Sequence, residues 1–228
     1  MSTPDLTPVR VWDAPVRLVH WLLVLCFAGA WLTAESERLH LLHITLGTTA
    51  GGLVAFRLVW GGVGSRWARF TSFVRPPSHA VAYLQALAAG RPPHHTGHNP
   101  AGGWAVLGLL ALVATTVGLG WLTELELLPA SLEEAHEAGA TVLLLLVGVH
   151  LAGVLVGSLA HRENLPRAML TGRKQGLPED DIGAPRRWVA GVLLLAVLGF
   201  WAWQWHSAPP GATAGLFQLG AEHDDDDD

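Results

Sequence analysis

Apolar residues gather in five long runs along the chain, separated by segments rich in proline, glycine and charged residues. The runs that we expect to form helices span residues 15–34, 40–61, 103–122, 135–159 and 186–206. Each run reaches the length of about 20 residues that an α-helix needs to cross roughly 30 Å of hydrocarbon. The pattern predicts an all-α integral membrane protein with a four-helix transmembrane bundle, a fifth C-terminal transmembrane helix, and an acidic tail over residues 207–228.

The composition favours the same class of protein. Only 14% of the residues are charged and the mean hydropathy is +0.35, whereas about 25% of the residues in a typical soluble domain are charged. The first apolar run is longer than a signal-peptide core and no clear cleavage site follows it, so we expect a retained helix. The single cysteine, Cys26, excludes a disulfide framework within the chain. No part of the chain has the composition typical of nucleic-acid binding.

The basic residues predict the orientation of the spans. With a cytoplasmic N-terminus, every lysine and arginine except Arg38 falls on the cytoplasmic side. Such a bias is what the positive-inside rule describes. The acidic loop before residue 135 and the aspartates at 224–228 then lie on the opposite side. We therefore expect a multi-pass protein with a cytoplasmic N-terminus and a periplasmic C-terminus.

Apart from His40 and His206, which are end residues of their runs, four histidines lie inside the apolar runs, where an ionisable side chain is costly and indicates a function. His136 and His150 are separated by close to four helical turns, so both leave the same face of one helix, about 21 Å apart. With the predicted orientation, His20 and His150 share the inner half of the membrane, whereas His43 and His136 lie near the outer face. Paired imidazoles from neighbouring helices suit the two axial positions of a haem iron. The pattern predicts two bis-histidine haem sites, one above the other.

Other interpretations of these residues stay open. A single histidine in a membrane helix often only hydrogen-bonds a neighbouring group, and His40 lies one turn before His43 and is an alternative ligand. A histidine-based metal-ion transporter would need carboxylates along its path, and the cores of the five runs contain none. A non-haem membrane anchor subunit would be colourless. The H-H-x-x-H segment formed by His94, His95 and His98 is either a metal site or a solvated loop.

Two arginines lie near the inner ends of the first two runs. A guanidinium binds a carboxylate in a forked, two-bond geometry, so Arg17 and Arg57 are candidates for binding haem propionates. Each arginine also has an ordinary role available, which is to anchor its helix at the membrane interface. The sequence does not decide between the two roles.

Several segments together resemble the prokaryotic cytochrome b561 family, which includes the b-type cytochrome subunits of nickel–iron hydrogenases. The matching segments are V-W-D-A-P-V-R-L-V-H-W at Val11–Trp21, H-I-T-L-G at His43–Gly47, F-R-L-V-W-G-G-V-G-S-R-W-A-R-F at Phe56–Phe70, H-N-P-A-G at His98–Gly102, E-E-A-H-E at Glu133–Glu137, and H-R-E-N-L-P-R-A-M-L-T-G-R-K at His161–Lys174. His98 in the fourth segment is a candidate to support a haem propionate or a quinone. The fifth apolar run and the acidic tail lie outside the resemblance.

The resemblance implies a di-haem cytochrome b domain over residues 1–175, with two b haems whose ligands match His20, His43, His136 and His150. It implies electron transfer across a bacterial inner membrane between the quinone pool and a redox partner, either a c-type cytochrome or a hydrogenase-like subunit. Membrane lipid and quinone or quinol are the other expected partners. The chain would then be an electron-transfer subunit of a respiratory oxidoreductase. Whether quinone binds to this chain or to another subunit is left open by the sequence.

Overall fold

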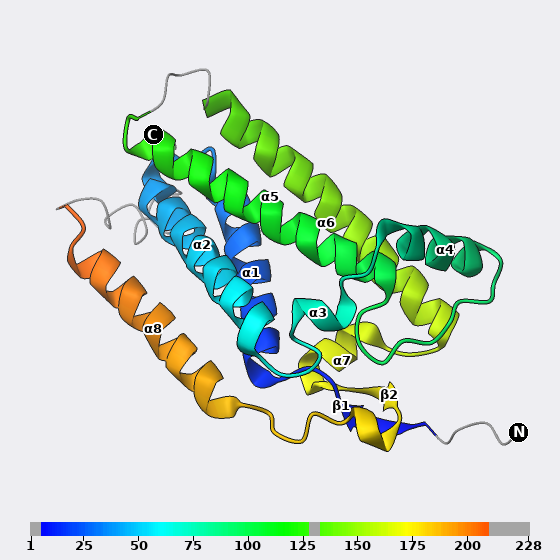
Figure 1. Cartoon of the computed structure of the whole chain (residues 1–228). Helices are drawn as coiled ribbons and strands as arrows, with labels where there is room; N and C mark the ends of the chain where they lie inside the picture. The colour runs from blue at the N-terminus through cyan, green and yellow to red at the C-terminus, as the bar shows by residue number, and fades with distance from the viewer. Residues whose placement is uncertain (1–5, 128–132, 210–228) are drawn as a thin grey trace, which may run out of the picture.

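The computed structural model describes residues 6–127 and 133–209, and five long helices form its framework (Figure 1). These helices are α1 (Ala14–Thr33), α2 (His40–Val63), α5 (Pro100–Glu124), α6 (Glu133–His161) and α8 (Arg187–His206). All five are long and apolar enough to cross a membrane. Each helix end lies within three residues of the position expected from the sequence. The prediction of a helical membrane bundle is therefore confirmed.

The first four long helices pack in sequence order, each against the next. Helix α1 packs against α2, α2 against α5, and α5 against α6, while α8 packs along α1. In Figure 1, α8 and α6 lie at opposite edges of the array. The indole Nε1 of Trp201 donates a 2.8 Å hydrogen bond to Thr49 Oγ1, which fastens α8 to α2. Since α8 does not intervene between α6 and the helices α1 and α2, the histidines of α6 are free to face those two helices.

Short polar side chains determine where several helices begin. Asp13 precedes α1 and accepts a 2.9 Å hydrogen bond from the Val16 amide. Asn99 precedes α5 and accepts a 2.7 Å bond from the Gly102 amide. Both side chains satisfy amides that have no partner within their helix, and a proline in the first turn favours the start of each helix. The caps fix the ends of α1 and α5 at the side of the bundle predicted to be cytoplasmic.

Most of the remaining structure lies at this same end of the bundle. We call it the inner-face platform, and it comprises β1 (Thr7–Arg10), α3 (Phe70–Phe73), α4 (Pro77–Ala88), α7 (Leu165–Thr171), β2 (Arg173–Gly176) and the 3₁₀ turn η3 (Pro178–Asp180). A second 3₁₀ turn, η1 (Glu37–Leu39), precedes α2 at the opposite end. Strands β1 and β2 pair antiparallel, with Val9 opposite Lys174. This two-stranded sheet was not expected in an all-α chain, because four-residue strands so far apart in sequence carry no recognisable pattern.

Two buried clusters hold the parts together. One joins the platform to α1 and contains Val9, Val11, Trp12, Val16, Ala68 and Ala168. The other lies within the bundle and contains Val19, Cys26, Leu46, Ala50, Leu53 and Val197. Gly172, with φ of +82°, ends α7 in a left-handed conformation, and a Cβ there would lie 2.6 Å from the Trp12 carbonyl oxygen. From residue 210 onward, the predicted acidic tail lies outside the described residues.

Candidate functional site

His43 of α2 and His136 of α6 face each other across the bundle; we call them the outer pair, after the predicted orientation. Their ring centroids are 6.2 Å apart, and the ring planes are inclined at 72°. Two imidazoles that share a metal through bonds of about 2 Å have centroids about 6 Å apart. The separation therefore fits two rings that bind one iron from opposite sides.

Backbone carbonyl groups orient both rings of the outer pair. The Nδ1 atom of His43 lies 2.9 Å from the Ala30 oxygen, and Nδ1 of His136 lies 2.9 Å from the Thr116 oxygen. Because a carbonyl oxygen only accepts hydrogen bonds, Nδ1 carries the proton in each ring and Nε2 keeps its lone pair. Metal-binding histidines are commonly held in this way.

Two glycines make room around the outer pair. Gly47 lies one turn after His43, and a Cβ there would meet no atom within 4 Å. A Cβ at Gly120 of α5 would lie 2.8 Å from the His136 ring, so the glycine lets that ring lie close to α5. Sequence reasoning missed Gly120, because only the tertiary packing of α5 on α6 reveals its neighbour. A Cβ at Gly51 would lie 3.0 Å from Val117, so this glycine serves the packing of α2 on α5.

His40 is directed toward the end of α5. Its Nε2 lies 3.3 Å from a carboxylate oxygen of Glu124, and both side chains are exposed. The structure thus brings His43, and not His40, against His136. This arrangement favours His43 as the ligand on α2.

His20 of α1 and His150 of α6 are the second predicted pair, which we call the inner pair. Both side chains are half-buried. The Nδ1 atom of His20 is buried and has no hydrogen-bond partner among the described residues. The inner pair therefore lacks the carbonyl hydrogen bond that orients each ring of the outer pair, at least at His20.

Charged side chains lie toward the platform end of α1 and α2, the two helices that carry Arg17 and Arg57. The guanidinium of Arg57 is buried, lies 5.0 Å from the centroid of the Phe70 ring, and leaves Nη1 without a partner in the described part of the chain. Arg17 donates from Nη1 to the Leu170 carbonyl, while its buried Nε has no partner there either. Asp13 is fully buried and accepts a 2.9 Å bond from Trp60 Nε1. Two cations against one carboxylate leave a positive excess, which suits an anionic group such as a propionate.

His98 lies next to this charged layer, at the end of the loop that leads into α5. Its ring packs between Trp12 and Phe73, with centroid distances of 4.6 and 4.4 Å. Its Nδ1 atom is buried, with no partner among residues 6–127 and 133–209. Burial, followed by the positive charges of Arg57 and Lys174, lowers the pKa of His98 to about 3, so the imidazole is neutral at physiological pH.

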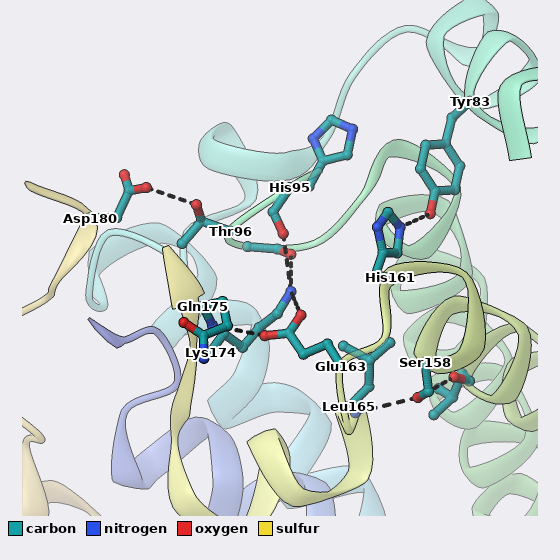
Figure 2. Close-up of polar contacts among 12 residues, drawn as sticks. Tyr83, His95, Thr96, Ser158, His161, Glu163, Leu165, Lys174, Gln175 and Asp180 are labelled. Carbon is teal, nitrogen blue, oxygen red and sulfur yellow. Dashed lines mark hydrogen bonds and ion pairs between the residues drawn. The ribbon is translucent and has the colours of Figure 1, made fainter. Parts of the chain in front are cut away.

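Figure 2 shows the polar cluster that holds the loop carrying His98. Lys174 of β2 is buried. Its Nζ atom lies 3.5 Å from Oε2 of Glu163 and donates a 3.0 Å hydrogen bond to the His95 carbonyl oxygen. Burial lowers the pKa of Lys174, and the Glu163 carboxylate offsets part of that effect. On the other side of the loop, Thr96 donates a 2.7 Å bond to Asp180. These contacts tie the loop to β2 and η3, and through Lys174 to Glu163, two residues after the end of α6.

The H-H-x-x-H segment does not gather into one site. The ring of His95 lies 5.7 Å from that of Tyr83, and His94 lies 6.1 Å from His161, whereas His98 contacts Trp12 and Phe73. Across the described residues, no group of three or more histidine, cysteine or acidic side chains is arranged to hold a metal ion. The segment is a structured loop whose three histidines have different neighbours.

The sequence matches the model of one protein family. Residues 11–172, well over half of the chain, match the family model of prokaryotic cytochrome b561. The chain belongs to the prokaryotic cytochrome b561 family. It is therefore a membrane b-type cytochrome of electron transfer, and family membership implies that it binds haem b. No curated protein and no solved structure matched the chain.

Proposed function

We propose that this cytochrome carries two b haems and passes electrons across a bacterial inner membrane, between the quinone pool and a redox partner. The observation that carries the proposal is the outer histidine pair, and the second predicted pair lies in another layer of the bundle. In the outer pair the ring separation is 6.2 Å, and carbonyl hydrogen bonds leave both Nε2 atoms available to a metal. His20 and His150 would hold the second haem in the inner layer.

Each group around the pairs has a distinct task in this proposal. The carbonyls of Ala30 and Thr116 hold the outer imidazoles in the orientation that presents Nε2. Arg17 and Arg57, each with a buried nitrogen that has no partner in the described chain, bind propionate carboxylates of the inner haem. The apolar helices exclude water and ions. Bound haem b supplies a one-electron acceptor in each layer.

The direction of the chain in the membrane is part of the proposal. The bias of basic residues supports a cytoplasmic N-terminus and a periplasmic C-terminus. The outer pair then lies near the periplasmic side, where a c-type cytochrome or a hydrogenase-like subunit would exchange electrons. Residues 1–175 form the di-haem domain, and α8 is an additional helix outside the family match. The chain would thus serve as the membrane subunit of a respiratory oxidoreductase.

The decisive measurement is a dithionite-reduced minus oxidised absorption spectrum of the purified protein, with haem quantified per chain. We expect b-type bands and about two haems per chain. A His79→Ala variant, altered on the exposed surface of α4, is the control and keeps both haems. A single haem per chain would overturn the di-haem assignment, and a colourless protein from haem-replete cells would overturn haem binding.

A second measurement tests the role of quinone. Adding a short-chain quinol to the oxidised protein should reduce haem, as followed by the growth of the reduced b-type bands. If quinol has no effect while dithionite reduces both haems, quinone exchange takes place on another subunit. The di-haem assignment would stand, and the quinone part of the proposal would be wrong.

A further inference from the structure

His98 occupies a precisely held position at the inner end of the bundle. Its ring lies between the aromatic side chains of Trp12 and Phe73. The residues before it are tied down on both sides, because Lys174 donates to the carbonyls of His95 and Gly97 and Thr96 donates to Asp180. The residue after it, Asn99, caps α5. This loop is therefore a rigid support and does not leave His98 free to turn toward solvent.

One polar atom of His98 lacks a hydrogen bond, although the ring is held firmly in place. Nδ1 is buried and has no hydrogen-bond partner among the described residues. Buried polar atoms are nearly always hydrogen-bonded, so one without a partner points to a group that belongs at this place. Arg57 Nη1 likewise has no partner among the described residues, and Arg57 and His150 both lie close enough to His98 to contribute, after burial, to the lowering of its pKa. The two unpartnered nitrogens thus lie in the same region, toward His150 of the inner pair.

The charges of the region indicate the chemistry of the missing partner. Arg57 and Lys174 carry positive charge near His98, which favours an anionic partner over a cation there. The imidazole itself is neutral, and a neutral imidazole has one N–H donor. A carboxylate accepts hydrogen bonds from a guanidinium and from an imidazole N–H at the same time. The group that fits is an anionic oxygen acceptor, and a haem bound by the inner pair carries two such carboxylates.

We propose that His98 is a positioning residue for the inner haem, whose propionate accepts a hydrogen bond from His98 Nδ1 beside Arg57. The inference rests on the proposed function, because it needs a haem held by His20 and His150. The hydrogen bond delocalises the negative charge of the carboxylate and so reduces its field at the iron. His98 therefore raises the midpoint potential of the inner haem and leaves the outer haem unaffected.

The test is a potentiometric titration of the full-length protein in three variants at this position. His98→Ala removes the ring, and His98→Phe fills the space between Trp12 and Phe73 without a donor. His98→Asn keeps a neutral N–H donor near the position of Nδ1. We expect the midpoint potential of the inner haem to fall in the alanine and phenylalanine variants and to return most of the way in the asparagine variant. His79→Ala serves as the matched control.

The inner haem is identified as the component that a His150→Ala variant loses, so each potential can be assigned to a layer. Haem content is measured in the same samples. Two unchanged potentials in His98→Phe, with both haems bound, would overturn the role of His98 and leave the di-haem assignment intact. Equal shifts in the phenylalanine and asparagine variants would also overturn it, because they would reflect packing and not hydrogen bonding. A wild-type protein without a second haem would refute the proposed function instead.

Discussion

The outer and inner histidine pairs lie in the same bundle but in different surroundings. At the outer pair, the backbone of α1 and α5 supplies one carbonyl to each ring, and the two rings face each other at 6.2 Å. At the inner pair, His20 Nδ1 is buried without a partner in the described chain. Arg17, Arg57 and the neutral His98 lie at the platform end of the bundle, and each has a buried nitrogen without a partner in the described chain.

The difference suggests two ways of building a cofactor site. The outer pair is oriented by the protein alone, through backbone atoms that no substitution of a side chain removes. Near the inner pair, two arginine side chains have nitrogen donors without a partner in the described chain, and their positive charge exceeds the negative charge of Asp13. An anionic cofactor would neutralise that excess positive charge. An electron would find different electrostatic surroundings in the two layers. We therefore expect the two haems to differ in midpoint potential, with the inner one more sensitive to substitutions.

The largest expected effect comes from removing one histidine of each pair. His150→Ala should abolish the inner haem, and His136→Ala should abolish the outer one, so that haem content falls from about two to about one per chain. Absorption spectra and haem quantification follow the loss. Full occupancy in His150→Ala would show that the pairing assigned to α6 is wrong.

A substitution at Gly47 tests the space beside the outer pair. Gly47→Leu would place a side chain where a Cβ meets no atom within 4 Å, one turn after His43. We expect the outer haem to be lost or much weakened while the inner haem stays bound. Gly62→Leu is the matched control, because its Cβ also meets no atom within 4 Å and it lies at the inner end of the same helix. Equal haem loss in both variants would indicate a general effect on α2.

Asp13 links the start of α1 to the inner layer. Asp13→Ala removes the cap of α1 and leaves Nε1 of the half-buried Trp60 without an acceptor from the chain. The expected loss of stability is about 2 kcal/mol, the sum of a helix cap and a partly buried unsatisfied donor. Thermal unfolding followed by tryptophan fluorescence measures it. Asp13→Asn keeps an oxygen acceptor, so we expect it to lose clearly less stability than Asp13→Ala. An equal loss of stability in the two variants would mean that the charge of Asp13, and not its hydrogen bonds, matters at this position.

The smallest expected effect is a dependence of platform stability on pH. Burial, followed by the charges of His94, His161 and Lys174, lowers the pKa of His95. As pH falls below the ordinary histidine value of about 6.5, the unfolded chain takes up a proton more readily than the folded one, so stability decreases. The unfolding temperature should therefore drop between pH 7.5 and 5.5, and His95→Asn should reduce that drop. His79→Asn, on the exposed surface of α4, should leave the drop in unfolding temperature unchanged.

Local sequence patterns were sufficient for the framework of this protein. Hydrophobic runs of membrane-spanning length predicted the five helices, because each run needs only its own residues to satisfy its backbone within a bilayer. Helical geometry alone placed His136 and His150 on one face of α6. The depth of each histidine then followed from the order of the helices along the chain.

Only the tertiary structure decided which residues meet at the inner end. The pairing of Val9 with Lys174, the bond from Trp60 to Asp13, and the place of His98 between Trp12 and Phe73 all join residues that are far apart in the sequence. Gly120 likewise matters only because α5 packs on α6 beside His136. A local pattern records the burial and period of its own segment, whereas such partnerships depend on how all the helices and loops fill space together.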